Sequence, residues 1–202
     1  ERVVLVDGSA LLYRAFFALP SSLATSAGVP TNATFGFAQM CRKVFAGKRP
    51  SFGAVVFDAP GATFREERFP AYKAQRPSMP AELRAQLDDV DRVVRAFGLP
   101  NLRVSGYEAD DVIATLTRDA LEAGHEVHIV SGDKDFAQLV GEHVRLVDTM
   151  RDVTYDAELV RKKWGVPPAQ IPDPPALMGD DIDNIPRVPG IGPQGAAALL
   201  EK

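Results

Sequence analysis

The apolar residues of this chain form short continuous runs, and three of these runs lead directly to acidic residues. The runs and their acids are residues 3–6 with Asp7, residues 54–57 with Asp58, and residues 127–130 with Asp133 and Asp135. Continuous apolar runs, as opposed to alternating ones, predict strands that are buried on both faces. The pattern therefore favours a parallel sheet that is covered by helices.

The rest of the pattern alternates strands with helices. Strands are predicted at residues 2–6, 52–57, 102–104, 126–130, 144–147 and 153–155. Helices are predicted at residues 9–18, 34–45, 81–97, 108–123 and 157–164. This alternation predicts an α/β fold with a mostly parallel central sheet and helices on its faces.

The composition changes near residue 166. From residue 167 onward Pro, Gly and small side chains predominate, which predicts a separate helical subdomain. We expect an α/β core over residues 1–166, with a cationic, Pro-punctuated connection near residues 61–80, and the start of a second subdomain over residues 167–202. Because residue 1 is Glu and not Met, we expect a fragment of a longer protein.

Glu108, Asp110 and Asp111 stand at the start of the predicted helix 108–123. The helix dipole favours acids at this end, so a charged, solvated helix start is one interpretation. Three neighbouring carboxylates also repel one another unless a cation neutralises them. The alternative interpretation is therefore a metal site.

Further acids are expected at the same place. Ligands of open α/β sheets bind beyond the carboxyl ends of the strands, where the strand-ending acids would meet this group. The acids expected to join it are Asp7, Asp58, Asp133 and Asp135, with Asp180 and Asp183 from a late acidic segment. Oxygen ligands without a Cys or His cluster indicate Mg²⁺ or Mn²⁺. Two such ions about 3.5–4 Å apart are typical of phosphodiester hydrolysis.

Composition and charge leave nucleic acid open as a substrate. The chain has 202 residues, 46% of them hydrophobic, and a single cysteine, Cys41, which fits a reducing compartment. No signal peptide or long apolar segment predicts a membrane location. The net charge is −4, but without the nine acids named above 23 basic and 18 acidic residues remain, a balance of +5. A surface of this kind is compatible with DNA.

The connection at residues 61–80 interleaves cations with aromatic residues. It contains Arg65, Tyr72, Lys73 and Arg76 beside two phenylalanines. Arg and Lys can hold phosphates while aromatic rings stack on bases, which is typical of an element that grips a nucleic-acid strand. A solvated loop whose aromatic rings pack on the core would show the same composition.

The C-terminal segment matches the dinucleotide-binding pattern G-x-G-x-x-G at residues 190–195. That pattern requires a preceding strand, and prolines at positions 186 and 189 exclude one. A Gly-rich hairpin between short helices fits better. In such a helix–hairpin–helix, Gly190 and Gly192 let the backbone approach a phosphate. A plain Gly-capped helical turn is the alternative.

Together these segments resemble the 5′ nuclease domain of bacterial DNA polymerase I, in the flap endonuclease superfamily. The landmarks are residues 6–9, 13–14, 57–58, 70–76, 107–111, 131–135 and 179–192. The resemblance covers essentially the whole chain. It implies a PIN-like, flap-endonuclease core with a truncated helix–hairpin–helix subdomain, and an enzyme that cleaves 5′ flaps and 5′ ends of nicked or branched duplex DNA in replication and repair.

The resemblance also implies roles for individual residues. The first ion would be held by Asp7, Asp58, Glu108, Asp110 and Asp111. The second ion would be served by Asp133, Asp135, Asp180 and Asp183. Lys73 and Arg76 would steer the scissile phosphate and Arg14 would help to position it, while Arg65, Tyr72, Gly190 and Gly192 would contact DNA.

Further expectations concern ions, partners and location. The resemblance implies two Mg²⁺ or Mn²⁺ ions, a candidate K⁺ site at the hairpin, a polymerase domain after this segment, and a bacterial cytoplasmic protein associated with the nucleoid. The sequence departs from the family pattern at Asp181-Ile182, at Arg187 and at Gln194-Gly195. These departures leave the acids intact and change the hairpin.

Two other classes of function remain open. A non-catalytic DNA-binding module would bind branched DNA and cleave it poorly. An RNase or another Mg²⁺ phosphohydrolase would use a related acidic α/β scaffold. The complete set of acids favours catalysis over the first of these, and the cations of residues 61–80 favour a polymeric substrate over a small phosphate ester.

Overall fold

The computed structural model describes residues 1–46 and 50–200, apart from the side chains of residues 193, 194, 197 and 198. Its centre is a six-stranded sheet of order β3-β2-β1-β4-β5-β6. The strands are β1 (Arg2–Asp7), β2 (Phe52–Val56), β3 (Asn101–Leu102), β4 (Glu126–Val130), β5 (Val144–Asp148) and β6 (Val153–Tyr155). All neighbours pair in parallel except β5 and β6. The predicted α/β fold is therefore confirmed.

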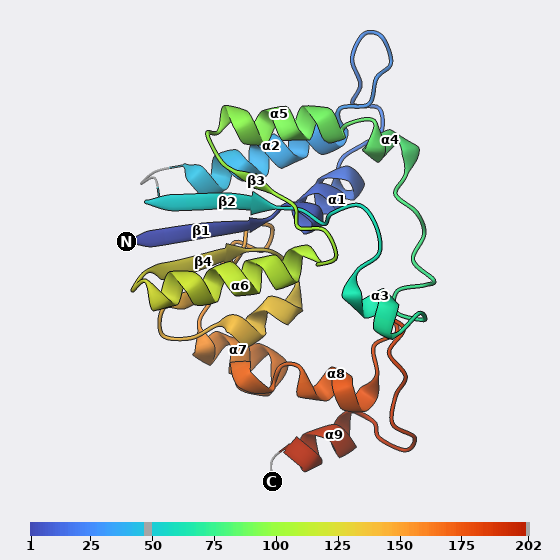
Figure 1. Ribbon diagram of the computed structural model, residues 1–202, viewed down its shortest axis with the longest axis vertical. Coiled ribbons are helices and arrows are strands. Elements are labelled where there is room, and N and C mark those ends of the chain that lie inside the picture. The colour runs from blue at the N-terminus through green and yellow to red at the C-terminus, as the bar shows by residue number, and fades with distance from the viewer. Residues whose placement is uncertain (47–49, 201–202) are drawn as a thin grey trace.

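Helices cover the sheet on both faces (Figure 1). One face carries α1 (Gly8–Ala18), α2 (Asn32–Phe45) and α5 (Leu87–Ala96), and the other carries α6 (Ala109–Glu122), the 3-10 helix η1 (Lys134–Leu139) and α7 (Ala157–Trp164). None of the described helices is long and apolar enough to cross a membrane.

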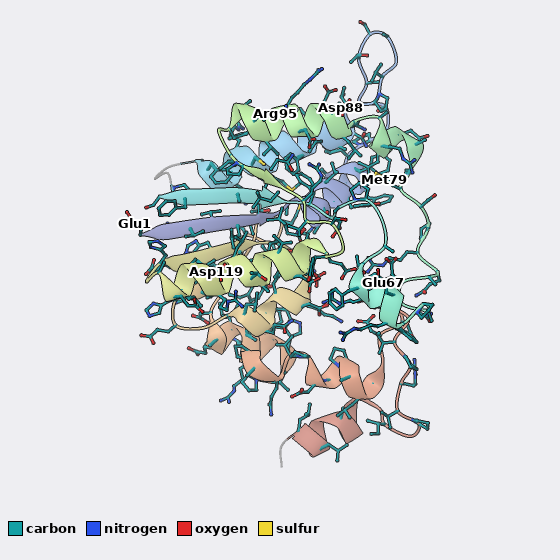
Figure 2. The ribbon with its side chains drawn as sticks, viewed as in Figure 1. Glu1, Glu67, Met79, Asp88, Arg95 and Asp119 are labelled. Carbon is teal, nitrogen blue, oxygen red and sulfur yellow. The ribbon has the colours of Figure 1, made fainter. Side chains whose placement is uncertain are left out.

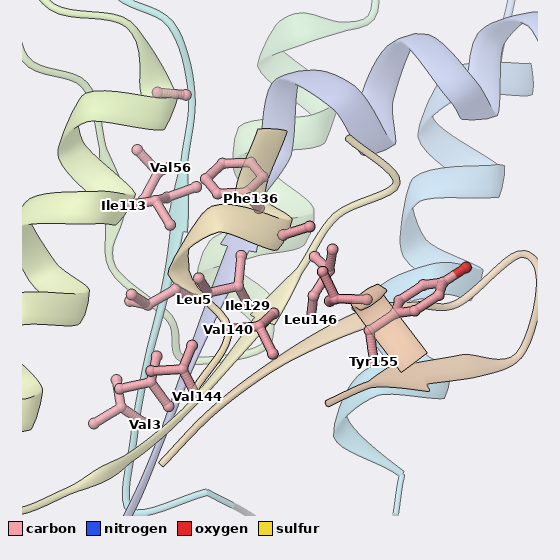
Figure 3. Packing of buried hydrophobic residues seen from close by; sticks show 14 of the residues in the cluster. Val3, Leu5, Val56, Ile113, Ile129, Phe136, Val140, Val144, Leu146 and Tyr155 are labelled. Carbon is pink, nitrogen blue, oxygen red and sulfur yellow. The ribbon is translucent and has the colours of Figure 1, made fainter. Parts of the chain in front are cut away.

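The two faces of β1 explain why its apolar run is continuous. Val3 and Leu5 belong to the core beneath α6, while Val4 and Val6 belong to the core beneath α1 and α2. Figure 3 shows Leu5 beside Ile129 of the neighbouring strand and Ile113 of α6. Full burial of one such side chain contributes about 1.5–3 kcal/mol, so each of these four positions favours the doubly covered place of the strand.

The strand order also fixes the position of the site. From β1 the chain first adds β2 and β3 on one side, and later adds β4 on the other side. The order reverses between β1 and β4, which is where open α/β sheets leave a crevice at the carboxyl ends of their strands. Asp7 ends β1 at this point, and Ser131 follows β4 directly.

The predicted single helix at residues 81–97 is wrong. The structure has a short helix α4 (Ala81–Arg84) and then α5, with a break at Ala85 and Gln86. Gln86 is fully buried. Its amide donates to Asn32 Oδ1 at 3.0 Å and its oxygen accepts from the Thr34 N–H at 3.0 Å. These bonds to α2 tie the break to the core.

Other differences are smaller. The connection at residues 61–80 contains an unpredicted helix, α3 (Phe64–Arg68), which a Thr63–Glu66 capping box begins. The strand predicted at residues 102–104 is the two-residue β3. The C-terminal part contains a 3-10 helix η2 (Pro168–Gln170), α8 (Asp173–Met178) and α9 (Pro193–Leu200).

Candidate active site

A cleft of about 650 Å³ lies at the carboxyl ends of the central strands. All nine predicted acids line it, from Asp7 at the end of β1 to Asp183 in the loop after α8. The segment around α3 forms its opposite wall, with Arg65, Tyr72, Lys73 and Arg76 also lining the cleft. Figure 2 shows polar side chains gathered between α3 and the strand ends. The convergence predicted from the sequence is therefore present.

The first group of acids, which we call the clustered carboxylates, comprises Asp7, Asp58, Asp110 and Asp133. Asp7 is 3% exposed. It caps α1 by accepting from the Ala10 N–H at 2.9 Å, and it accepts from the Ser131 hydroxyl at 2.7 Å. Burial raises the pKa of Asp7 to about 6 despite these bonds, with Asp58 and Asp133 adding to the rise.

Asp110 is affected both by burial and by the neighbouring carboxylates. Burial, followed by the charges of Asp7, Asp133 and Asp58, raises the pKa of Asp110 to about 8. Asp58 is tied to the same helix, because its Oδ1 accepts from the Ala109 N–H at 2.8 Å. The fold thus holds several carboxylates together where their charges oppose each other, which a divalent cation would relieve.

The second group, the bridged carboxylates, comprises Glu108, Asp111, Asp180 and Asp183, and each pairs with a cation. Lys73 Nζ lies 2.6 Å from Glu108 Oε1, Arg76 Nη2 lies 2.8 Å from Asp183 Oδ1, and Lys134 Nζ lies 3.3 Å from Asp180 Oδ2. Arg65 grips both oxygens of Asp111, at 2.6 and 2.7 Å.

Asp135, in the first turn of η1, lies between the two groups, because the charges of Asp133 from one group and of Asp183 and Asp180 from the other all act on it. Asp133 caps η1 by accepting from the Asp135 N–H at 2.9 Å. Burial raises the pKa of Asp135 above its usual range, with Asp133 as the next cause. The pKa of Asp180 is lowered, because hydrogen bonds from the Ile182 and Asp183 amides and the charge of Lys134 outweigh its desolvation.

The donor set fits a hard divalent cation. It consists of carboxylate oxygens held by strand ends and by the first turn of α6, which suits Mg²⁺ or Mn²⁺ better than zinc. As the side chains stand, no three His, Cys, Asp or Glu residues in the described part of the chain are arranged closely enough to enclose an ion.

The segment from Thr63 to Arg76, which we call the bridging segment, crosses the cleft and meets the loop after α8. The Lys73 N–H donates to the Asp183 carbonyl at 3.1 Å, and Asn184 Nδ2 donates to the Ala71 carbonyl at 2.7 Å. Figure 1 shows α3 beside this loop. Lys73 has a φ of +54°, a left-handed conformation that costs a non-glycine residue about 1–2 kcal/mol.

Tyr72, which the family resemblance implies as a DNA contact, is buried beneath this segment. It is 8% exposed, and its hydroxyl donates to Glu108 Oε2 at 3.0 Å. Burial, together with the charges of Glu108 and Asp183, raises the pKa of its hydroxyl. In this position the Tyr72 hydroxyl acts as a hydrogen-bond donor to the Glu108 carboxylate.

Three predicted site residues lie away from the cleft. Arg14 is not among the residues that line it, and its Nη1 contacts Asp148 Oδ1 at 3.2 Å. To reach Asp148 the guanidinium crosses Gly132, where a Cβ would lie 1.4 Å from Nη2. Gly190 and Gly192 lie in the turn before α9, with Gly190 at a φ of +79°, and they also do not line the cleft.

Two site residues were missed by the sequence interpretation. Ser131 is 1% exposed and bonds both Asp7 and the Asp133 N–H, so it aligns the ends of β1 and β4. Lys134 supplies the cation that pairs with Asp180. Both belong to the Ser131-Gly132-Asp133-Lys134-Asp135 segment, whose acids were recognised while its other polar side chains were not.

Comparison with known proteins identifies the family. The model of the 5′-3′ exonuclease N-terminal resolvase-like domain matches residues 2–165, and that of the 5′-3′ exonuclease C-terminal SAM fold matches residues 166–202. The chain belongs to the 5′-3′ exonuclease family. The expected family and enzyme class, a nuclease, are thereby confirmed.

Individual relatives agree with this family. DNA polymerase I of Pseudomonas aeruginosa is 53% identical over 98% of the chain, which spans 22% of that relative's length. The 5′-3′ exonuclease of Aquifex aeolicus is 46% identical over the whole chain, which spans 70% of it.

Solved structures of this 5′-3′ exonuclease fold are similar as well. The zinc-bound T5 5′-exonuclease has a TM-score of 0.77 at 23% identity, and all of this chain aligns with 75% of that one. A complex of the bacteriophage T5 flap endonuclease with DNA and metal ions has a TM-score of 0.73 at 24% identity, with the same shares covered. These likenesses establish the fold.

Proposed function

We propose that this chain is a divalent-metal-dependent, structure-specific 5′ nuclease that hydrolyses phosphodiesters at 5′ flaps and 5′ ends of branched duplex DNA. The observation that carries the proposal is the group of clustered carboxylates that the fold holds together: burial, followed by the charges of Asp7, Asp133 and Asp58, raises the pKa of Asp110 to about 8. A fold that holds these charges together is suited to cations. The nuclease family and the DNA- and metal-bound relative of similar fold support the same activity.

The proposed metal-binding residues are the acids that line the cleft. Asp7, Asp58, Glu108, Asp110 and Asp111 would hold one Mg²⁺ or Mn²⁺ ion, and Asp133, Asp135, Asp180 and Asp183 would hold a second. Bound ions would stabilise the charge that develops on the attacking and leaving oxygens of the phosphodiester. Glu108, Asp180 and Asp183 would have to exchange their present cations for an ion, so the bridging segment and the metals share ligands.

The protein's own cations would place the substrate. Lys73 and Arg76 lie on the wall of the cleft opposite the clustered carboxylates, and a phosphate between the two walls would be within reach of both side chains. A guanidinium and an ammonium there would orient the phosphodiester and stabilise its transition state. The hairpin with Gly190 and Gly192 would hold duplex DNA through backbone N–H groups, with K⁺ as a candidate ion.

One set of reactions tests the proposal. Labelled 5′-flap, blunt duplex and single-stranded DNA are each incubated with the protein, with and without Mg²⁺ or Mn²⁺. We expect metal-dependent cleavage near the branch of the flap substrate and weak cleavage of single strands. Tight binding of the flap without cleavage would indicate a DNA-binding module, and preferential cleavage of RNA would indicate an RNase on the same scaffold.

A further inference from the structure

Asp110 and Asp111 are neighbours in the sequence but have opposite surroundings. Asp110 faces Asp7, Asp58 and Asp133, and their charges add to the rise of its pKa. Asp111 faces the bridging segment. Its Oδ1 accepts from Arg65 Nη2 at 2.7 Å, while its Oδ2 accepts from Arg65 Nη1 at 2.6 Å and from the Glu108 N–H at 3.1 Å. Both oxygens of Asp111 therefore have partners from the protein.

Arg65 is held in place on more than one side. Its guanidinium lies 4.7 Å from the centre of the Phe64 ring, which packs against Tyr107 at 5.6 Å. The Phe64 N–H donates to the Gly106 carbonyl at 3.0 Å, which fixes α3 to the start of α6. A bidentate guanidinium–carboxylate pair is strong and specific in its geometry, and here the arginine is oriented before the pair forms.

The pair lies at one end of the bridging segment and Lys73 lies near the other. Lys73 returns to the same first turn of α6, where it contacts Glu108. Between these two contacts the segment makes its turn over the cleft, including the left-handed conformation of Lys73. The Arg65–Asp111 pair and the Lys73–Glu108 contact therefore both tie the bridging segment to the first turn of α6.

We propose that Asp111 and Arg65 form an anchor that docks the bridging segment on α6, so that Asp111 positions Lys73 through Arg65 and is not itself a metal ligand. This inference rests on the proposed function and changes the role of one acid within it. Arg65, expected from the sequence to contact DNA, becomes a positioning residue as well.

Two double variants of equal charge test the anchor. Arg65→Gln with Asp111→Asn removes one positive and one negative charge, and so does Arg65→Gln with Asp110→Asn. The asparagine at position 111 keeps an oxygen for the Glu108 N–H, so the capping bond of α6 survives. The Mn²⁺ affinity of each protein is measured by calorimetry without DNA.

We expect the Arg65–Asp111 double variant to bind Mn²⁺ within about twofold of the wild type, as for sites that do not interact. The Arg65–Asp110 double variant should lose more than about tenfold in affinity, because it lacks a ligand. Asp111→Asn alone should bind more weakly than the double variant, because it leaves the charge of Arg65 unbalanced beside the ions. Equal losses in the two double variants would make Asp111 a ligand and overturn the proposal.

Hydrogen exchange reports the docking itself, independently of nuclease activity. In metal-free protein, Arg65→Gln, Asp111→Asn and their combination should each speed exchange of the amides of residues 64–76 by about tenfold, with the combination no faster than the single variants. Arg68→Gln, one turn along α3, is the matched control and should leave exchange unchanged. Unchanged exchange in Arg65→Gln, with a shallower salt dependence of DNA binding, would make Arg65 a phosphate contact instead.

In single-turnover cleavage, the Arg65–Asp111 double variant should be about tenfold slower than wild type at saturating Mn²⁺. Undiminished cleavage, in a protein whose bridging segment exchanges faster, would show that the anchor does not position Lys73. If the wild-type protein cleaves no DNA with either metal, the proposed nuclease fails, while the affinity and exchange results still decide whether Asp111 is an anchor or a ligand.

Discussion

The negative charges of the two groups of carboxylates in the cleft are balanced in different ways. The clustered carboxylates come from the carboxyl ends of the strands and the start of α6, and burial together with their mutual charges raises the pKa values of Asp7 and Asp110. The bridged carboxylates lie nearer the bridging segment and η1, and lysine or arginine side chains neutralise them. The first group is therefore prepared for a cation from solution, and the second already has one from the protein.

The comparison predicts that removing a clustered charge will stabilise the protein while abolishing its activity. Asp110→Asn should lower flap cleavage by at least about 1,000-fold. The same change relieves repulsion, so the metal-free melting temperature should hold or rise, by about 2–4 °C for each kcal/mol gained. Cleavage assays and calorimetric melting on one preparation give both values.

Asp88→Asn on α5 is the matched control, since Asp88 is exposed and far from the cleft (Figure 2). It should leave cleavage unchanged and should not raise the melting temperature, because it removes an acid that the dipole of α5 favours. Asp110→Asn with near wild-type cleavage would remove Asp110 from the proposed metal site.

Loss of the Lys73 ammonium should lower the rate of cleavage more than it lowers the affinity for DNA. Lys73→Ala should lower the single-turnover rate on a 5′ flap by about 100-fold, with a much smaller loss of duplex affinity. Lysine and alanine tolerate a φ of +54° about equally, so the fold should persist. Lys162→Ala on α7 is the control. A loss of stability with unchanged turnover by the folded fraction would make the segment purely structural.

The stability of the metal-free protein should fall as pH rises, because the pKa values of two clustered carboxylates are raised in the folded state. The folded-state pKa of Asp110 is about 8 and that of Asp7 about 6, both above the ordinary aspartate value of 3.8. Below about pH 4 the two carboxyls are protonated in the folded and in the unfolded chain. As pH rises above about 4 they ionise in the unfolded chain before they do so in the folded one. The free energy of unfolding of the metal-free protein should therefore fall as pH rises from about 4 to 8.

Melting temperatures across this range, with and without Mg²⁺, measure the effect. Mg²⁺ should raise the melting temperature most at the alkaline end, and Asp110→Asn should flatten the metal-free profile. A metal-free stability that rises toward pH 8 would contradict the repulsion argument.

The smallest expected effect lies at the hairpin, outside both groups. Gln194→Lys should steepen the dependence of log affinity on log salt by about 0.9 for each added phosphate contact and tighten binding to downstream duplex, without moving the cut. The side chain of Gln194 lies outside the described part of the structure, so this prediction rests on the sequence. An unchanged slope and affinity would show that the hairpin of this chain does not contact DNA.

The fold and the set of acids could be predicted because each depends on local pattern. An apolar run followed by Asp identifies both a buried strand and its carboxyl end, and parallel strands bring these ends together. Asp7 and Asp58 are found in this way from fewer than ten residues each. The same reasoning places Glu108 and Asp111 on one turn, where the Glu108 N–H does bond Asp111.

The remaining features depend on partners distant in sequence. Gln86 breaks a helix because Asn32 lies beside it in the core. Arg14 pairs with Asp148, and Gly132 is the residue that gives it room. The cation that each bridged carboxylate takes is equally non-local, since the sequence between positions 61 and 80 permits several pairings. Charge composition alone could not select among them.

The central position of β1 has a consequence for how the chain folds as it is made. Leu5 pairs with Ala54 on one side and with Ile129 on the other, so the first strand synthesised waits for the fourth before both of its edges are covered. Synthesis at about 5–20 residues per second leaves this apolar strand with an open edge for several seconds, a period in which it can pair wrongly. The loop that carries Asp180 and Asp183 emerges later still. A nascent chain therefore cannot assemble the complete cleft until nearly all of this segment has left the ribosome, which delays any cutting of nucleic acid beside the site of synthesis.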